Sequence, residues 1–429
     1  MRLAVFTTRY PARGAMFFRR DMSALLAAGV EVDLFPIYPL DEKLWRDDRD
    51  RLAIDAIPRD RIHNIGIAES LARLRPWPLG KVGRFTRDAL AITASAARFG
   101  VTPAAKSAYV LPKAWAWARG FADRYDHILA YWGNYAGTCA YVFHRLIDRP
   151  IPLSFWLHAG TDLYRQQVFL RQKLVYADTI ITCCEFNKRY MQERYSDLAT
   201  MIDEKTHVCY HGLDLSTFPY LPEGRPPRRI IAVGRMARHK GFDYLLRAAQ
   251  ELQRRGTPVD LELVGDGEEL DALKALARGL GIADRVAFRG WLTFSDVRTA
   301  MTGATVLVHP SDGLGDGLPN VLREAMAVGT PVIASNVAGI PEALDGGRCG
   351  TLVPPKEVHA LADAIATLLN DASLRRRHAE LGRQRTEEKF ELWGNGMRLA
   401  ERLRSTQRRA RPVPGTAASA PSVAGSKSC

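Results

Sequence analysis

Residues 230–241 read IIAVGRMARHKG, and residues 316–331 read DGLPNVLREAMAVGTP. The first stretch passes from an apolar run into a polar loop that contains Arg235 and Lys240. The second passes from a polar loop into a segment whose apolar residues have helical spacing. Apolar runs followed by polar loops and amphipathic segments are typical of βα units. We therefore predict that each stretch is a strand-to-helix turn at the ligand-binding edge of a parallel sheet.

The same alternation runs through the second half of the chain. The expected strands are Ile230–Val233, Leu261–Val264, Val286–Phe288, Thr305–His309, Pro331–Ala334 and Thr351–Val353. Segments with helical spacing separate most of them, as right-handed βαβ units require. This half therefore predicts a doubly wound parallel sheet.

The first half of the chain also has an α/β pattern. The expected strands are Leu3–Phe6, Val30–Phe35, Ile128–Tyr131, Leu153–Leu157 and Thr179–Cys183, with a helix at Phe17–Ala28. Residues 71–119 are the least regular part of it. A proline-rich connector at 219–227 marks a domain boundary. We predict a Rossmann-like domain over 1–218, a second one over 219–387, and a disordered tail over 406–429.

Bulk properties limit the class of protein. A chain of 429 residues is too long for one typical core, and 47% hydrophobic with 25% charged residues is ordinary for a globular protein. Six cysteines without C-x-x-C spacing favour a reduced, cytoplasmic setting over a disulfide framework. No apolar run reaches membrane-spanning length. The net charge of +13 favours anionic partners, although charge runs are as often solvated helix faces.

The loop after the strand Ile230–Val233 carries groups that suit a diphosphate. Arg235 offers a planar fork of donors to phosphate oxygens, and Lys240 adds a point charge near a helix N-terminus, which itself favours anions. Gly234 lets the backbone approach a ligand closely. Taken alone, these cations are equally well explained as exposed loop residues.

The second polar loop makes ligand binding the favoured interpretation. Pro319 suits the first turn of a helix, so that the N–H groups of Asn320 and the two residues after it would point into a cleft. Asp316 lies just before this helix and Glu324 about one turn inside it, where carboxylates can accept hydrogen bonds from a sugar and a ribose diol. The alternative is a carboxylate that satisfies the helix dipole, together with a surface glutamate.

In combination, these motifs resemble those of the retaining, nucleotide-sugar-dependent glycosyltransferases of family 4, whose two facing Rossmann-like domains form the GT-B fold. The resemblance extends to about Arg404 and is strongest over residues 231–355. The motifs are Gly-Arg-x4-Lys-Gly at 234–241, Val-Gly-Asp-Gly at 264–267, Phe-Arg-Gly at 288–290 and Gly-Leu-Pro-Asn-x3-Glu-Ala-Met-Ala-x-Gly-Thr-Pro-Val at 317–332.

The resemblance implies roles for individual residues. Arg235 and Lys240 would neutralise the departing diphosphate, and neither a metal nor another cofactor is expected. Glu324 would bind the donor ribose, the amide of Leu322 would meet phosphate, and the region around Gly290 would meet the base. The backbone that would hold the sugar belongs to Gly317, Leu318, Pro319 and Asn320.

The resemblance also covers positions where the chain departs from the family or where a structural role is the alternative. Asp316 replaces the first glutamate of the usual Glu-x7-Glu, which keeps the carboxylate but shortens its reach. His158 matches a loop whose imidazole faces the transferring sugar, although a structural histidine is the alternative. Gly14 is the candidate for close approach to the diphosphate or acceptor, and His211 is interpreted as structural. Residues 388–405 would form a helix that crosses back to the N-terminal domain.

The implied function is that of a hexosyltransferase, which moves a sugar from a nucleoside-diphosphate sugar to a glycan or polyprenyl-diphosphate-linked acceptor in surface or exopolysaccharide assembly. The tryptophans and arginines of residues 71–119 suit peripheral contact with an anionic membrane at its cytoplasmic face. A nucleotide-sugar epimerase or hydrolase on the same fold is the alternative. An oxidoreductase is disfavoured because neither first turn has G-x-G-x-x-G with an acidic residue about 20 positions on. Nucleic-acid binding is disfavoured because recognition motifs are missing.

Overall fold

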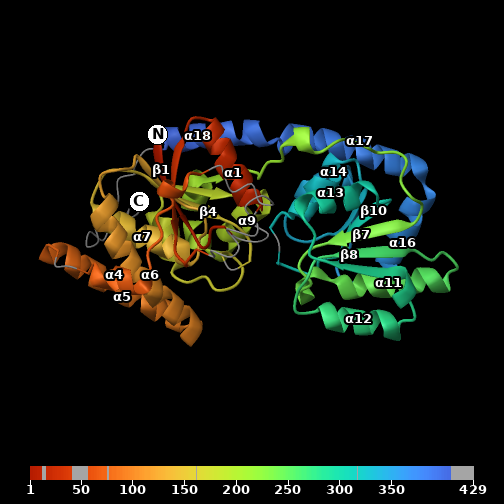
Figure 1. Cartoon of the computed structure of the whole chain (residues 1–429), viewed down its shortest axis with the longest axis horizontal. Coiled ribbons are helices and arrows are strands. Elements are labelled where there is room, and N and C mark those ends of the chain that lie inside the picture. Colours follow the sequence, from red (N-terminus) through yellow and green to blue (C-terminus); the bar gives the residue numbers. More distant parts are fainter. Residues whose placement is uncertain (12–15, 41–56, 75–76, 161, 316, 407–429) are drawn as a thin grey trace, which may run out of the picture.

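Two α/β domains lie side by side, each built on a six-stranded sheet (Figure 1). The computed structural model describes residues 1–11, 16–40, 57–74, 77–160, 162–315 and 317–406. Two predicted site residues, Gly14 and Asp316, lie outside the described residues, as does the tail from residue 407 onward. The architecture confirms the predicted fold class of two facing, doubly wound parallel sheets.

The N-terminal sheet has the strand order β2-β1-β3-β4-β5-β6, and all its pairs are parallel. Its strands are β1 (Arg2–Thr7), β2 (Glu31–Pro36), β3 (His127–Ala130), β4 (Leu153–Leu157), β5 (Thr179–Thr182) and β6 (Thr206–Val208). Side chains alternate between the two faces, so Leu3 and Val5 belong to one core cluster while Ala4 and Phe6 belong to the other. The sequence did not predict β6, because three residues at a sheet edge are too few to establish a period.

The C-terminal sheet has the order β12-β11-β10-β7-β8-β9, again entirely parallel. Its strands are β7 (Arg229–Val233), β8 (Asp260–Val264), β9 (Val286–Gly290), β10 (Val306–His309), β11 (Val332–Ser335) and β12 (Thr351–Val353). From β7 the chain adds strands first on one side of the sheet (β8, β9) and then on the other (β10, β11, β12), so the strand order reverses between the parallel neighbours β7 and β10. In open α/β sheets, ligands bind at this kind of switch point, outside the carboxyl ends of the strands.

Helices cover both faces of both sheets (Figure 1). Those of the N-terminal half are α1 (Met16–Ala27), α4 (Ile67–Ala72), α5 (Leu79–Ala97), α6 (Val101–Phe121), α7 (Tyr135–Ile147), α8 (Leu170–Tyr176), α9 (Glu185–Arg194) and α10 (Ala199–Lys205). Those that follow are α11 (Phe242–Arg254), α12 (Leu270–Gly279), α13 (Phe294–Thr302), α14 (Asn320–Ala327), α15 (Ile340–Ala343), α16 (Val358–Asn370), α17 (Ala372–Lys389) and α18 (Leu392–Ser405). In the C-terminal domain, α11, α12 and α16 pack on one face of the sheet and α13, α14 and α15 on the other.

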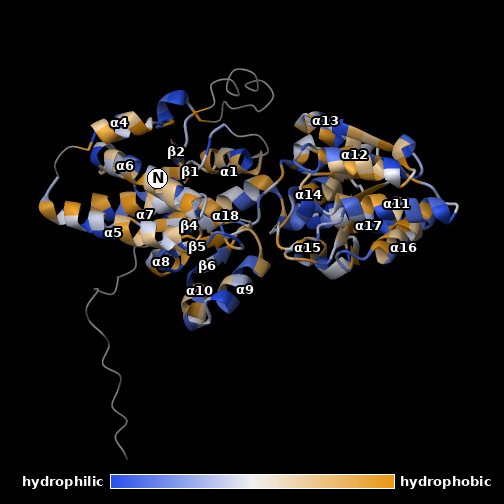
Figure 2. Ribbon diagram, turned by 90° about the horizontal axis from the view of Figure 1, so that it is seen from below, coloured by the Kyte–Doolittle hydropathy of each residue, from blue (hydrophilic) through white to orange (hydrophobic). Residues whose placement is uncertain are grey.

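The expectation that residues 71–119 are irregular was wrong, because α5 and most of α6 fall in this stretch. Two of its three tryptophans are not available to a membrane, since Trp115 and Trp117 are buried in the core. The third, Trp77, lies edge-on to Trp115 with ring centroids 5.1 Å apart. These helices form the outer edge of the N-terminal domain, away from the C-terminal domain (Figures 1 and 2). Among the described residues, no helix is both long and apolar enough to cross a bilayer.

The last helix among the described residues packs on the first domain. Helix α18 lies along α1, and a Cβ on Gly396 would come within 2.3 Å of the Ala24 Cβ. A second link joins the domains near β5, where the Glu342 carboxylate accepts hydrogen bonds from the Glu185 and Phe186 amides at 2.9 and 3.2 Å and from the Tyr210 hydroxyl at 2.7 Å. A carboxylate of the C-terminal domain therefore caps helix α9 of the N-terminal domain.

Candidate active site

A cleft of about 1140 Å³ lies between the domains at the carboxyl ends of their strands. Its C-terminal wall includes Gly234, Arg235, Lys240, Trp291, Phe294, Gly317, Leu318, Pro319, Asn320 and Glu324. Its N-terminal wall includes Phe17, Trp132, His158, Cys183 and His211. The structure thus brings together most of the predicted site residues that it describes. Gly290 and Leu322 do not line the cleft themselves but are adjacent in sequence to Trp291 and Val321, which do.

The loop after β7 presents two cations at the mouth of the cleft. The Arg235 side chain is 71% exposed, and its Nη2 lies 2.9 Å from Glu268 Oε2. Lys240 closes a short 3-10 turn before α11. Gly241, which follows, has a φ of 68°, and a Cβ there would lie 2.0 Å from the Pro310 carbonyl oxygen. Glycine is therefore required for the loop after β7 to meet the loop after β10.

The loop after β10 leads into an open helix N-terminus. Pro319 is the N-cap of α14, and no side chain of the described residues caps this end. The N–H groups of the first turn can therefore serve a ligand, and the helix dipole favours an anion there. Gly317 lies against the other domain, because a Cβ on it would be 3.3 Å from Cys183 Sγ and from the Ala159 Cβ.

Glu324 is buried on α14 and is bound from the N-terminal domain. Arg20 Nη1, from α1, donates to Glu324 Oε1 at 3.0 Å, and both side chains are about nine-tenths buried. The Arg20 guanidinium also lies over the Phe294 ring, 4.7 Å from its centroid. Arg323, next to Glu324, is fully buried and donates to the His211 carbonyl oxygen and to Asn320. Glu324 is thus fixed by a partner that the motif on α14 did not reveal.

His158 follows β4 and forms part of a column of rings. Its imidazole is parallel to that of His211, with centroids 5.1 Å apart, and lies 4.5 Å from the Trp132 ring. Its Nδ1 is 3.5 Å from Asp162 Oδ2, and within the described part of the chain neither ring nitrogen has a hydrogen-bond partner. Because the side chain lines the cleft, these nitrogens are placed to meet a bound group.

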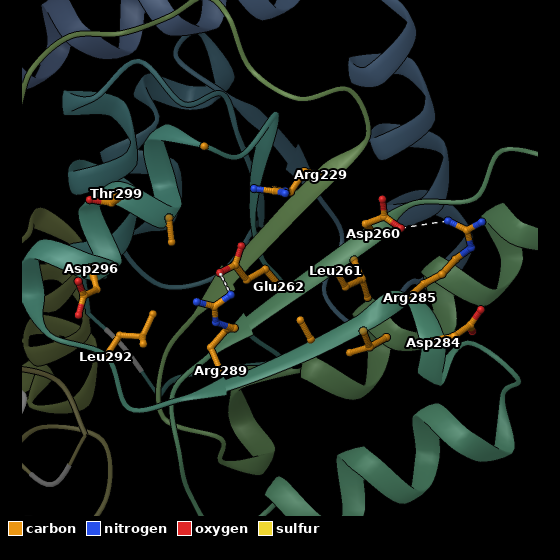
Figure 3. A pocket seen from close by; sticks show the side chains of 14 residues that line it. Arg229, Asp260, Leu261, Glu262, Asp284, Arg285, Arg289, Leu292, Asp296 and Thr299 are labelled. Atoms are coloured by element: carbon orange, nitrogen blue, oxygen red, sulfur yellow. Dashed lines mark hydrogen bonds and ion pairs between the residues drawn. The ribbon is translucent and has the colours of Figure 1, made fainter.

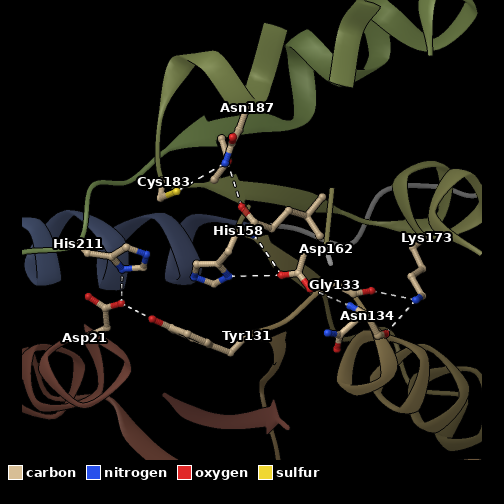
Figure 4. A network of polar contacts seen from close by, with 12 residues as sticks. Asp21, Tyr131, Gly133, Asn134, His158, Asp162, Lys173, Cys183, Asn187 and His211 are labelled. Carbon is tan, nitrogen blue, oxygen red and sulfur yellow. Dashed lines mark hydrogen bonds and ion pairs between the residues drawn. The ribbon is translucent and has the colours of Figure 1, made fainter. Parts of the chain in front are cut away.

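A buried polar network lies behind the N-terminal wall of the cleft (Figure 4). Asp21 Oδ2 accepts a hydrogen bond from the Tyr131 hydroxyl at 2.5 Å and lies 2.6 Å from His211 Nδ1. Burial opposes a charge on His211, but the Asp21 carboxylate prevails and raises the pKa of this histidine to about 9. His211 is therefore an imidazolium at neutral pH, directly beneath His158.

Nearby, Lys173 donates to the carbonyl oxygens of Gly133, Asn134 and Val168 at 2.8 to 3.1 Å and fixes the loop after β3 (Figure 4). Burial lowers the pKa of this lysine to about 7.

Sequence reasoning missed the contribution of α1 to this site. Arg20 and Asp21 are consecutive and both buried. From sequence alone, a charged pair in the middle of an amphipathic helix is expected on the face exposed to solvent. His211 was interpreted as structural, but its side chain lines the cleft. In the sequence, the signal for His211 was its position directly before Gly212. In the structure, a Cβ on Gly212 would lie 2.3 Å from the Cα of Leu392, so glycine is required there.

A second hollow lies beside β7, β8 and β9 (Figure 3). It has a volume of about 750 Å³ and is open to solvent. Four of its charged side chains form two ion pairs: Arg285 with Asp260 at 3.0 Å, and Arg289 with Glu262 at 3.5 Å. No predicted site residue lines it. Among the described residues, no cluster of histidine, cysteine or acidic side chains could hold a metal ion.

The fold defines a class of protein. The structure superimposes on that of Anabaena HepE in complex with UDP with a TM-score of 0.69 at 20% identity, over 94% of this chain and 99% of the other. At this identity the likeness concerns the fold, which is therefore GT-B.

A family model matches the sequence of the second domain. Residues 227–371 match the model of the family described as Glycosyl transferases group 1. This confirms the resemblance that the motifs predicted.

Two curated relatives are similar over parts of the chain. A GDP-mannose-dependent alpha-(1-6)-phosphatidylinositol monomannoside mannosyltransferase from Mycolicibacterium smegmatis is 31% identical over 241 residues, which are 53% of this chain and 63% of the relative. A putative colanic acid biosynthesis glycosyltransferase, WcaL from Escherichia coli, is 32% identical over 169 residues, 38% of this chain and 42% of the relative. The matches thus span about half the length of these relatives.

Proposed function

We propose that this protein is a retaining glycosyltransferase that moves a hexose from a nucleoside-diphosphate sugar to an acceptor hydroxyl. One observation carries the proposal: the two cations after β7, the open N-terminus of α14 after β10 and the carboxylate of Glu324 line one cleft at the switch point of the C-terminal sheet. The relatives give support, because one is named for its use of GDP-mannose and the structure of HepE contains UDP.

In the proposed reaction, the bond between the anomeric carbon and the diphosphate oxygen breaks, and the electron pair leaves with the diphosphate. Arg235 and Lys240 stabilise the charge that develops on it, together with the first-turn amides of α14. The acceptor oxygen bonds to the anomeric carbon on the face that the diphosphate leaves, and its proton passes to a diphosphate oxygen. Configuration is thereby retained. His158 faces the transferring sugar, and Glu324 holds the ribose.

No divalent metal is required in this proposal, because side-chain cations and the helix end supply the positive charge. Transfer should therefore persist in EDTA. Activity that falls in EDTA and returns with magnesium would contradict this part of the proposal.

The decisive experiment incubates the purified protein with UDP-, GDP- and ADP-sugars, with and without a membrane lipid extract. Nucleoside diphosphate release and sugar transfer are both scored. We expect acceptor-dependent release from one donor. Lys240→Ala should reduce it by about 100- to 1,000-fold, as loss of a transition-state donor does elsewhere. Arg238→Ala, in the same turn but outside the cleft lining, is the matched control and should keep its activity. Release that ignores the acceptor would refute transfer.

We further propose a lipid-linked acceptor at the cytoplasmic face of a membrane, in surface or exopolysaccharide assembly. The name of WcaL, a relative assigned to colanic acid biosynthesis, supports this acceptor class. Helix α5 supports membrane contact, because Leu79 and Leu90 lie on one stripe of it and are 88% and 67% exposed, with Arg87 between them.

The membrane contact is tested with vesicles that contain anionic lipid. Leu79→Gln combined with Leu90→Gln should reduce sedimentation of the protein with the vesicles several-fold. Leu221→Gln, an exposed leucine in the connector, is the control and should leave it unchanged. Equal sedimentation of all three proteins would contradict a role for α5.

A further inference from the structure

Cys183 directly follows β5 and reaches the cleft with its sulfur. The residue is 5% exposed and lines the cleft wall between the domains. A Cβ on Gly317 would lie 3.3 Å from Cys183 Sγ, so the thiol is in contact with the loop that leads into α14. Asn187 Nδ2 donates to the same sulfur at 3.5 Å. The sulfur is thus held in place in the wall of the cleft, at the edge of the hydrophobic cluster to which Cys183 also belongs.

A carboxylate and an imidazole lie on the same side of the cleft as this thiol (Figure 4). Asp21 holds His211 Nδ1 at 2.6 Å. The opposite nitrogen of this imidazole, Nε2, is buried and has no other polar partner among the described residues, and the ring lies close enough to Cys183 to interact with its thiol. The order carboxylate, imidazole, thiol is the one that activates a sulfur nucleophile, because the imidazolium stabilises the thiolate.

The electrostatics agree with this geometry. A hydrogen bond with the neighbouring Cys184 thiol and the positive charge of His211 lower the pKa of Cys183 well below its usual value, against the effect of burial. The other described cysteines behave in the opposite way. Burial raises the pKa of Cys139 and Cys349, and it raises that of Cys209 to about 12. The hydrogen bond with Cys183, together with burial, raises the pKa of Cys184. A reagent that requires a thiolate should therefore distinguish Cys183 from them.

We infer that Cys183 is a nucleophilic thiol and a modification site for small electrophiles such as hydrogen peroxide. The thiolate attacks one peroxide oxygen, an S–O bond forms as the O–O bond breaks, and hydroxide leaves and takes up a proton to become water. The sulfur becomes a sulfenic acid, oxidised by two electrons, and the peroxide is reduced. An added oxygen at Sγ would press on Gly317. If the cleft binds the donor as proposed above, oxidation therefore blocks the sugar position.

The first test is the rate of alkylation in the full-length protein. After a short exposure to iodoacetamide, tandem mass spectrometry quantifies each cysteine and separates Cys183 from Cys184. We expect Cys183 to react at least about tenfold faster than Cys139, Cys209 and Cys349. His211→Asn, which removes the imidazolium but keeps a similar side-chain size, should slow Cys183 by about tenfold. Cys209→Ser is the matched control and should leave the rate at Cys183 unchanged.

The second test uses hydrogen peroxide with dimedone, which traps sulfenic acids. A dimedone adduct on Cys183 is expected. Peroxide treatment should lower the activity of the wild-type protein, whereas treated and untreated Cys183→Ser should have the same activity. Labelling of Cys183 no faster than that of Cys209, or peroxide damage elsewhere only, would overturn the inference. These measurements on the wild-type protein require no glycosyltransferase activity. Fast labelling that no nucleotide sugar slows would instead count against the proposed donor site.

Discussion

The two walls of the cleft hold their charges in different surroundings. On the N-terminal side, the consecutive residues Arg20 and Asp21 of α1 are buried, and they bind Glu324 and His211. On the C-terminal side, Arg235 pairs with a glutamate at the mouth of the cleft, where both side chains are largely exposed. The first pairs are fixed in place before any ligand arrives, whereas the second is in exchange with water.

This difference suggests a division of labour in donor binding. Breaking an exposed ion pair costs little, so a diphosphate can replace the carboxylate that Arg235 binds. Removing one member of a buried pair leaves an uncompensated charge, which is costly. In the proposed donor complex, α1 would hold Glu324 and the histidine column rigid, while the loop after β7 would adjust when the donor binds.

The largest expected effect comes from breaking the pair between the domains. Arg20→Ala leaves Glu324 buried without its cation and should cost about 3–5 kcal/mol of unfolding free energy. Urea unfolding measures this. In the double variant with Glu324→Ala, the cost should be much less than the sum of the single effects, because the two residues share one interaction. If the costs of the two single variants simply added up in the double variant, a specific pair would be contradicted. Arg20→Lys keeps a positive charge and should be more stable than Arg20→Ala.

A smaller effect is expected from the second buried pair, and it depends on pH. The pKa of His211 is raised from 6.5 to about 9 in the folded protein. Its contribution to stability is therefore complete below about pH 6.5 and is lost as pH rises through about 9, by on the order of 3 kcal/mol. His211→Asn should remove this part of the pH dependence, which unfolding curves at pH 6 and pH 9.5 would reveal. If the free energy of unfolding changed equally with pH in both proteins, His211 would be neutral in the folded state.

The smallest effect is expected at the exposed pair. Glu268→Gln frees Arg235 from its competitor and should improve nucleoside diphosphate affinity by less than about fivefold, since exposed pairs contribute about 1 kcal/mol or less. Isothermal titration measures the change. The gain should shrink at high salt, because both groups are in water. A loss of affinity would mean that Glu268 orients Arg235 rather than competing for it.

Sequence patterns predicted the fold well where the signal is local. The strands are short runs of mostly apolar residues, and Leu153–Leu157 and Thr351–Val353 have the bounds that were expected. Residues 71–119 were misjudged because alanine, tryptophan and arginine in α5 and α6 follow no clean polar–apolar alternation, although the second half of α6 is largely buried. Helical propensity was the better guide there.

The same contrast explains which parts of the candidate site could be foreseen. The C-terminal wall comes from two continuous motifs, so the residues around Lys240 and Pro319 could be named from spacing. The N-terminal wall is assembled from side chains far apart in sequence: Asp21 lies 190 positions from His211, and Arg20 lies 304 from Glu324. Such pairs follow from the docking of whole elements, which no local pattern encodes.

The position of α18 has a consequence for how the protein is made. Leu399, Ala400 and Leu403 complete the core that Phe18, Met22 and Leu25 of α1 begin, and they are among the last described residues to be synthesised. On the ribosome, the domain that is translated first is therefore finished last, whereas the sheet from β7 to β12 can close earlier. A nascent chain stalled before residue 392 would expose the apolar groove beside α1 to chaperones and proteases, and the emergence of α18 would end that exposure.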